Sequence, residues 1–185
     1  MSKHHQYIIE NEEGHSIFRP KGKRFEVLSF KRLEYTSENI VFLSEKIRTN
    51  LTDDLISNDV RKKYPSGHPR WNRTLFGQCV PATFTFLYFM NTNILSPVRG
   101  QDIEGEGHWW LIDNNNGDII DLTKDQYGTD ELVGVYSTGK KRGYYGSKEA
   151  PACRFFRLMQ RVQPTSSLYE INSLREIKSY QSYSL

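Results

Sequence analysis

One segment, GQCVPATFTFLYFM at positions 77–90, constrains the fold of this chain more than any other stretch. It is almost wholly apolar, which is typical of a helix that is buried on every side. Pro81 is tolerated in the first turn of a helix, where its missing N–H is not needed, but it disrupts a helix further in. We therefore predict a buried helix from about Gln78 to Asn91, beginning directly after the loop-forming Gly77.

Cys79 falls in the first turn of this predicted helix, among unpaired backbone N–H groups and at the positive end of the helix dipole. That environment stabilises a thiolate, which is the reactive form of cysteine, and the same N–H groups could stabilise an oxyanion. A free cysteine in an apolar run is also often a small buried side chain with no chemical role. Taken alone, the segment favours this second interpretation.

The size and composition of the chain limit the remaining possibilities. A length of 185 residues suits one domain with a core of its own, and 13% aromatic residues argue against disorder. The net charge is only +3 and the basic residues are scattered, so neither a nucleic-acid nor a membrane partner is expected. With two cysteines, a polar N-terminus and no apolar run of membrane-spanning length, we expect a cytoplasmic protein.

The hydrophobic pattern divides the chain into three parts. Residues 1–37 read as a β-rich N-terminal extension, residues 38–163 as the core domain, and residues 164–185 as a tail with a weak hint of one more helix. Helices followed by strands indicate an α+β fold.

Within the core domain the pattern predicts the elements in order. We expect a helix over 40–51, a second helix that is capped by Thr52 and includes Val60, a loop over 64–77, and the buried helix. Strands over 98–103, 108–113 and 118–122, a glycine- and tyrosine-rich loop over 134–146, and a last amphipathic helix over 152–162 follow.

The segment GHWWLIDNNNGDIIDLT, residues 107–123, is a strong hairpin signal, because Asn-Asn-Asn-Gly separates two apolar runs. A four-residue loop pairs Ile112 with Ile119. Since side chains alternate along a strand, four of them then project from one face. These are His108, Trp110, Asp121 and Thr123. Asp121 becomes the diagonal neighbour of His108, within reach of a carboxylate–imidazole hydrogen bond.

A histidine beside a carboxylate is what nucleophilic catalysis requires. The carboxylate fixes the ring tautomer and stabilises the imidazolium, while the other ring nitrogen takes the proton of the nucleophile. His108 could equally be an ordinary strand histidine, and Asp121 a polar residue close to a turn. The pair alone does not choose between these interpretations.

Taken in order, Cys79, His108 and Asp121 place a thiol on a helix tip, an imidazole on a strand and a carboxylate on the next strand. The arrangement resembles the papain-like/transglutaminase-like superfamily, whose core packs a cysteine-bearing helix on an antiparallel β-sheet. More narrowly it is similar to the YunG-like bacterial and phage proteins, in the motifs Gly77-Gln78-Cys79, His108-Trp109-Trp110, Asp121–Tyr127 and Arg154…Leu158…Arg161-Val162. The resemblance covers about 70–163 and implies a Cys79–His108–Asp121 triad.

The resemblance leaves the oxyanion donor open. Papain-type enzymes usually carry a glutamine about six positions before the cysteine, and here that position is Arg73, with Asn72 adjacent. Asn72 and Gln78 are therefore candidates, beside the backbone N–H of Cys79. Trp110 could line the substrate cleft, shield the His–Asp pair or simply pack.

The function that we expect is thiol-dependent acyl transfer on a protein or peptide-like amide, by hydrolysis or transamidation, with no cofactor and no metal. A zinc site built from Cys79, Cys153, His68 and His108 lacks the close ligand spacing of such sites. His68 is an alternative base, but its loop offers no orienting carboxylate. The alternative function is a catalytically silent fold that acts as a protein-interaction module. The oligomeric state stays open.

Overall fold

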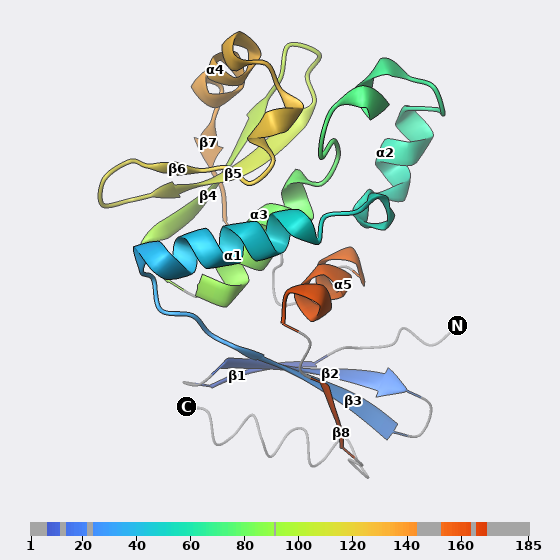
Figure 1. The fold of residues 1–185 in the computed structure, drawn as a ribbon, viewed down its shortest axis with the longest axis vertical. Helices are drawn as coiled ribbons and strands as arrows, with labels where there is room; N and C mark the ends of the chain where they lie inside the picture. The colour runs from blue at the N-terminus through green and yellow to red at the C-terminus, as the bar shows by residue number, and fades with distance from the viewer. Residues whose placement is uncertain are drawn as a thin grey trace.

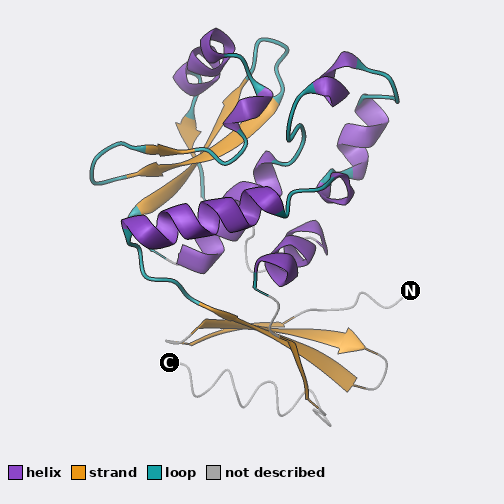
Figure 2. Ribbon diagram, in the orientation of Figure 1, coloured by secondary structure: helices purple, strands orange, loops and turns teal. Residues whose placement is uncertain are grey.

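The computed structural model describes residues 7–11, 14–21, 24–90, 92–143, 153–163 and 166–169. The α+β expectation is confirmed, because helices combine with two four-stranded antiparallel sheets (Figure 1). In the view of Figure 2 the main helices lie between the two sheets. Among the described residues, no helix is both long and apolar enough to cross a membrane.

The first sheet joins the two ends of the described chain. Its strands are β1 (Tyr7–Asn11), β2 (Gly14–Lys21), β3 (Arg24–Lys31) and β8 (Ser166–Tyr169), in the order β1-β2-β3-β8. Residues 1–37 are β-rich, as expected, and β8 pairs with β3 although some 140 positions separate them, as in Phe25 opposite Tyr169. The helix suggested for the tail falls mostly on residues 170–185, which lie outside the described residues.

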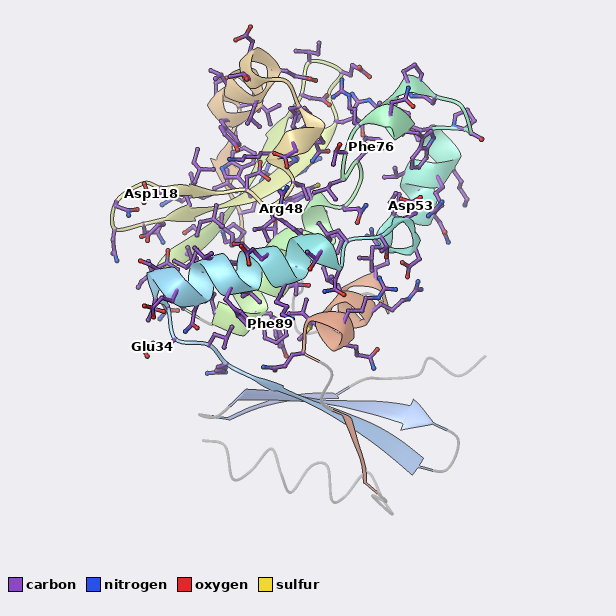
Figure 3. The ribbon with its side chains drawn as sticks, viewed as in Figure 1. Glu34, Arg48, Asp53, Phe76, Phe89 and Asp118 are labelled. Atoms are coloured by element: carbon purple, nitrogen blue, oxygen red, sulfur yellow. The ribbon has the colours of Figure 1, made fainter. Side chains whose placement is uncertain are left out.

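Three helices enclose the main core. They are α1 (Ser37–Thr49), α3 (Cys79–Met90) and α5 (Cys153–Val162), close to the three expected ranges. Thr36 caps α1 by accepting a hydrogen bond from the Asn39 N–H at 3.2 Å. Phe89, near the end of α3, is labelled in Figure 3 and is buried in this core. The core also contains Leu43, Ile47, Phe86, Leu158 and Met159.

The second sheet has the order β6-β5-β4-β7. Its strands are β4 (Leu95–Gln101), β5 (Gly107–Asp113), β6 (Ile119–Ile120) and β7 (Lys140–Lys141). The predicted hairpin register is confirmed, since Ile112 lies opposite Ile119 and the Asp113 N–H donates to the Asp118 carbonyl at 2.9 Å. The helix α3 packs on β5 through the Phe84 and Trp109 rings, whose centroids are 5.2 Å apart.

Two local expectations were wrong. Thr52 caps no long helix. The segment divides into a short 3-10 helix, η1 (Asp53–Leu55), and α2 (Asn58–Lys63), which is capped by Ser57 through the Val60 N–H at 3.2 Å. The loop expected over 134–146 contains the end of α4 (Thr129–Ser137) and β7, while residues 144–146 lie outside the described part of the chain.

Candidate active site

Cys79 is the first residue of α3, because the chain turns sharply just before it. Gly77 has a φ of 73°, a backbone conformation that favours glycine. The helical hydrogen bonds then begin with the Ala82 N–H, which donates to the Gln78 carbonyl at 3.1 Å. The Cys79 residue is 7% exposed, and its thiol contacts the Gly107 carbonyl oxygen at 4.0 Å. The start of α3 therefore holds the sulfur against the first residue of β5.

Three polar groups at this helix start have no hydrogen-bond partner among the described residues: the backbone N–H groups of Cys79 and Val80 and the side-chain oxygen of Gln78. Among the described residues, no hydrogen-bond acceptor faces the backbone N–H groups of Cys79 and Val80, as expected for the first turn of a helix. The Gln78 side chain is buried, and its Oε1 atom has no hydrogen-bond partner within the same residues. Buried polar atoms are nearly always paired, so the Gln78 oxygen, one residue before Cys79, is available to accept a hydrogen bond from a ligand.

His108 and Asp121 form a buried pair across the hairpin. The His108 Nε2 atom lies 2.6 Å from Asp121 Oδ2, and the two side chains are 0% and 1% exposed. His108 belongs to β5, and Asp121 directly follows β6. The structure thus brings together the diagonal pair that the alternation of the two strands predicts.

Further hydrogen bonds fix the Asp121 carboxylate. Its Oδ1 accepts from the Thr123 backbone N–H at 2.9 Å, and its Oδ2 accepts from the Tyr136 hydroxyl at 3.0 Å. Arg48 of α1, labelled in Figure 3, donates to the Leu122 carbonyl at 2.7 Å and also pairs with Asp125. The segment that carries Asp121 is therefore tied to α1 and α4 as well as to the sheet.

The second nitrogen of the His108 ring, Nδ1, is the one that Asp121 leaves free. The Gln126 amide nitrogen lies 3.3 Å from Nδ1 and donates to the Thr123 carbonyl at 2.9 Å. Two aromatic rings hold the imidazole in place: Trp110 stacks on it with centroids 5.7 Å apart, and Tyr127 meets it edge-on at 5.0 Å. The ring therefore has little freedom to rotate.

The pKa of His108 follows from three effects. Burial by itself lowers this pKa, because it disfavours the charged ring. The hydrogen bond to Asp121 and the interaction with the Cys79 thiol act in the opposite direction and together raise the pKa to about 9. The imidazolium form is therefore favoured at neutral pH, and the thiol contributes to that preference.

This raised pKa predicts how stability depends on pH. A histidine whose pKa is higher in the folded state than the unfolded value of about 6.5 stabilises the fold fully below that value. The contribution, about 3 kcal/mol, is lost as the pH rises through about 9. We expect urea unfolding of the wild type to lose about this much stability between pH 6.5 and pH 9.5. The His108→Gln variant should lose much less, and an equal loss in both proteins would contradict the assignment.

The remaining residues that the sequence suggested for the site are not placed to contact a substrate or to act as the base. Asn72 is exposed at the end of the 3-10 helix η2 (Pro69–Asn72), and within the described residues no contact joins it to Cys79. Trp110 is 1% exposed, so it packs against the imidazole and leaves no surface for a substrate. His68 caps η2 by accepting from the Arg70 N–H at 3.2 Å. Across the described chain, no group of three His, Cys, Asp or Glu side chains is placed to hold a metal ion.

Two site residues were missed from the sequence. Gln126 follows Thr123 in the 3-10 helix η3 (Lys124–Gln126), where no periodic pattern points to its orientation. Tyr136 lies on α4, in a stretch that we expected to form a loop. The one sequence signal for Gln126 is its short separation from the hairpin, which favours a structural role beside the strands.

The evidence for this site is its geometry, because comparison with known proteins adds nothing to it. No protein-family model, no curated protein and no solved structure matches the chain.

Proposed function

We propose that this protein is a cysteine-dependent acyl-transfer enzyme with Cys79 as the nucleophile, His108 as the base and Asp121 as the orienting carboxylate. One observation carries the proposal. The His108 ring is fully buried, its Nε2 is bound to Asp121 at 2.6 Å, and the Cys79 thiol is, after Asp121, one of the groups that raise the pKa of the ring. A buried imidazole that is fixed by a carboxylate on one side and faces a thiol is suited to proton transfer from that thiol.

The chemistry follows from the positions of these groups. His108 Nδ1 accepts the proton of the Cys79 thiol, and the thiolate attacks the carbonyl carbon of an amide. The carbonyl oxygen becomes an oxyanion, for which the backbone N–H groups of Cys79 and Val80 are donors, and the side-chain NH₂ group of the buried Gln78 is a further candidate donor. His108 then returns the proton to the amine as the C–N bond breaks, and an acyl thioester is left on Cys79.

The thioester is resolved in a second half-reaction. Water, or a second amine, gives up a proton to His108 and attacks the thioester carbonyl, so that Cys79 is released as a thiol. Attack by water makes the protein a peptidase or amidase, whereas attack by an amine makes it transglutaminase-like. Both outcomes use the same three residues and a protein or peptide-like amide, and neither needs a cofactor.

The proposal extends to the fold. The helix α3, which carries Cys79, packs on β5, which carries His108. This packing supports the proposal that the core is papain-like/transglutaminase-like. Gln78 takes the place of the usual upstream glutamine in this proposal, because it is buried at the helix start, whereas Asn72 is exposed.

Thiol reactivity tests the proposal without knowledge of the substrate. At pH 6 an ordinary thiol is less than about 1% ionised, whereas a thiol beside an imidazolium is ionised to a greater extent. We expect iodoacetamide to alkylate Cys79 at least about tenfold faster than glutathione at pH 6. The measurement is mass spectrometry of the Cys79 peptide over time, which separates it from Cys153.

The control variant is His108→Gln, which should slow alkylation at pH 6 to the rate of an ordinary thiol. If wild-type Cys79 reacts no faster than glutathione, or if His108→Gln reacts as fast as the wild type, the enzyme proposal is wrong. The interaction-module hypothesis would then be the one to pursue.

A further inference from the structure

Arg99 lies on the same face of the second sheet as the helix that carries Cys79. It is opposite Trp109 in the β4–β5 ladder, and side chains opposite one another share a face. Trp109 packs against Phe84 of α3, and Thr83 of α3 donates to the Trp109 carbonyl at 3.0 Å. The Arg99 side chain therefore starts from the face that α3 covers.

The guanidinium extends over Gly107, the residue that contacts the sulfur. Gly107 lies diagonally from Arg99 in the ladder, and a Cβ atom placed on Gly107 would be 2.7 Å from Arg99 Nη2 and 2.8 Å from Nε. The guanidinium thus occupies the space that a side chain at position 107 would fill. Because the Gly107 carbonyl contacts the Cys79 thiol, Arg99 is separated from the sulfur by this single residue.

No acidic side chain among the described residues pairs with Arg99. Within the described residues its side chain is partly buried and makes no ion pair or hydrogen bond. The acidic residues of the adjacent hairpin loop are bound to other cations: Asp102 and Glu104 to Arg70, and Glu106 to Lys63. The residue opposite Arg99 in β7, Lys140, is also basic. A partly buried cation of this kind is stabilised when an anion binds to it.

We propose that Arg99 binds a carboxylate of the acyl substrate and places it beside the amide that Cys79 attacks. The inference rests on the proposed function and names its substrate class, an amide next to an acidic group. A guanidinium binds a carboxylate through two parallel hydrogen bonds, and the nearby N-terminus of α3 favours negative charge as well. The carboxylate is that of an acidic side chain or of a chain terminus.

Three matched alkylating probes test the proposal on the full chain. Chloroacetyl-glutamine amide is neutral, chloroacetyl-glutamic acid α-amide carries a side-chain carboxylate, and chloroacetyl-glutamine with a free C-terminus carries a terminal one. We expect one or both acidic probes to alkylate Cys79 about tenfold faster than the neutral probe at low salt, and the Arg99→Gln variant to lose most of that preference. The faster acidic probe identifies the source of the carboxylate.

The controls separate this inference from the proposed function. His108 attracts anions in every variant, so the result lies in the difference between wild type and Arg99→Gln, with the neutral probe reporting whether the thiol is still reactive. Lys62→Gln, which removes an exposed charge from α2, should keep the wild-type preference, and Arg99→Lys should keep part of it. Equal preferences in wild type and Arg99→Gln, or no preference in the wild type, would overturn the inference even where Cys79 is highly reactive.

Discussion

Asp121→Asn should reduce the proposed acyl transfer by roughly 10⁴-fold while leaving the fold in place. The reason is a reversal of the His108 tautomer. The Thr123 N–H donates to Oδ1 at 2.9 Å, so the carbonyl oxygen of an asparagine has to take that position. Its NH₂ group then occupies the Oδ2 position and donates to His108 Nε2. The ring proton moves to Nδ1, which can no longer accept the proton of Cys79.

Two measurements detect this change of tautomer. Alkylation of Cys79 at pH 6 should fall to the rate of an ordinary thiol, and ¹⁵N NMR of His108 should report a neutral ring protonated at Nδ1. The pKa of His108 should fall well below its wild-type value of about 9, because its main raising contact is gone. Tyr136→Phe is the matched control: it removes the other donor to Oδ2 and keeps its ring against Trp110. In Tyr136→Phe the Nδ1 atom of His108 should still accept a proton, so alkylation should stay close to the wild-type rate. If Asp121→Asn gives the same alkylation rate and the same ¹⁵N spectrum as Tyr136→Phe, the carboxylate does not set the tautomer.

The part of the site that the sequence could predict depends on short-range rules. The loop at 114–117 sets the register of β5 and β6, and side-chain alternation then places His108 and Asp121 on one face. Pro81 and Gly77 likewise mark the start of α3 to within one residue. Each rule acts over a few positions and needs no knowledge of the remaining fold.

The remaining features depend on contacts between distant parts of the chain. The strand β8 pairs with β3 through a connection that spans the whole core, and no local pattern specifies such a pairing. The helix α4 has little apolar periodicity and contains Gly134, and of its residues only Val135 is buried, so packing on β4 decides its formation. Gln126 reaches His108, and Arg99 reaches Gly107 beside Cys79, only because the β4–β5 hairpin and η3 pack together in the folded chain.

Arg70 should be the most important single side chain for the stability of this region. It is 3% exposed and binds Asp102, whose side chain is 0% exposed, at 2.8 Å. Asp102 in turn accepts the backbone N–H groups of Glu104 and Glu106 at 3.0 and 2.9 Å. The guanidinium also lies over the ring of Phe76, which is labelled in Figure 3, with 5.6 Å from its carbon to the ring centroid.

We expect Arg70→Met to lower the free energy of unfolding by about 3–5 kcal/mol, because it leaves the Asp102 carboxylate buried and unpaired. Urea unfolding at pH 7 measures the change. Glu104→Gln is the control, since the Glu104 side chain is 51% exposed, and it should cost less than about 1 kcal/mol. Adding Asp102→Asn to Arg70→Met should recover part of the loss, because the asparagine removes the unpaired charge and keeps an acceptor for the two N–H groups. Equal stabilities of Arg70→Met and Glu104→Gln would contradict this role.

The position of the Arg70–Asp102 pair links its stability to the proposed chemistry. Arg70 belongs to the segment that leads into Cys79, and Asp102 to the hairpin loop that leads into His108. The ion pair thus joins the segment before Cys79 to the loop before His108. Arg70→Met should therefore slow alkylation of Cys79 at pH 6 even in urea-free buffer where the protein is folded. The double variant should recover stability and alkylation only in part, because it removes the unpaired buried charge of Asp102 but does not restore the contact between the two segments.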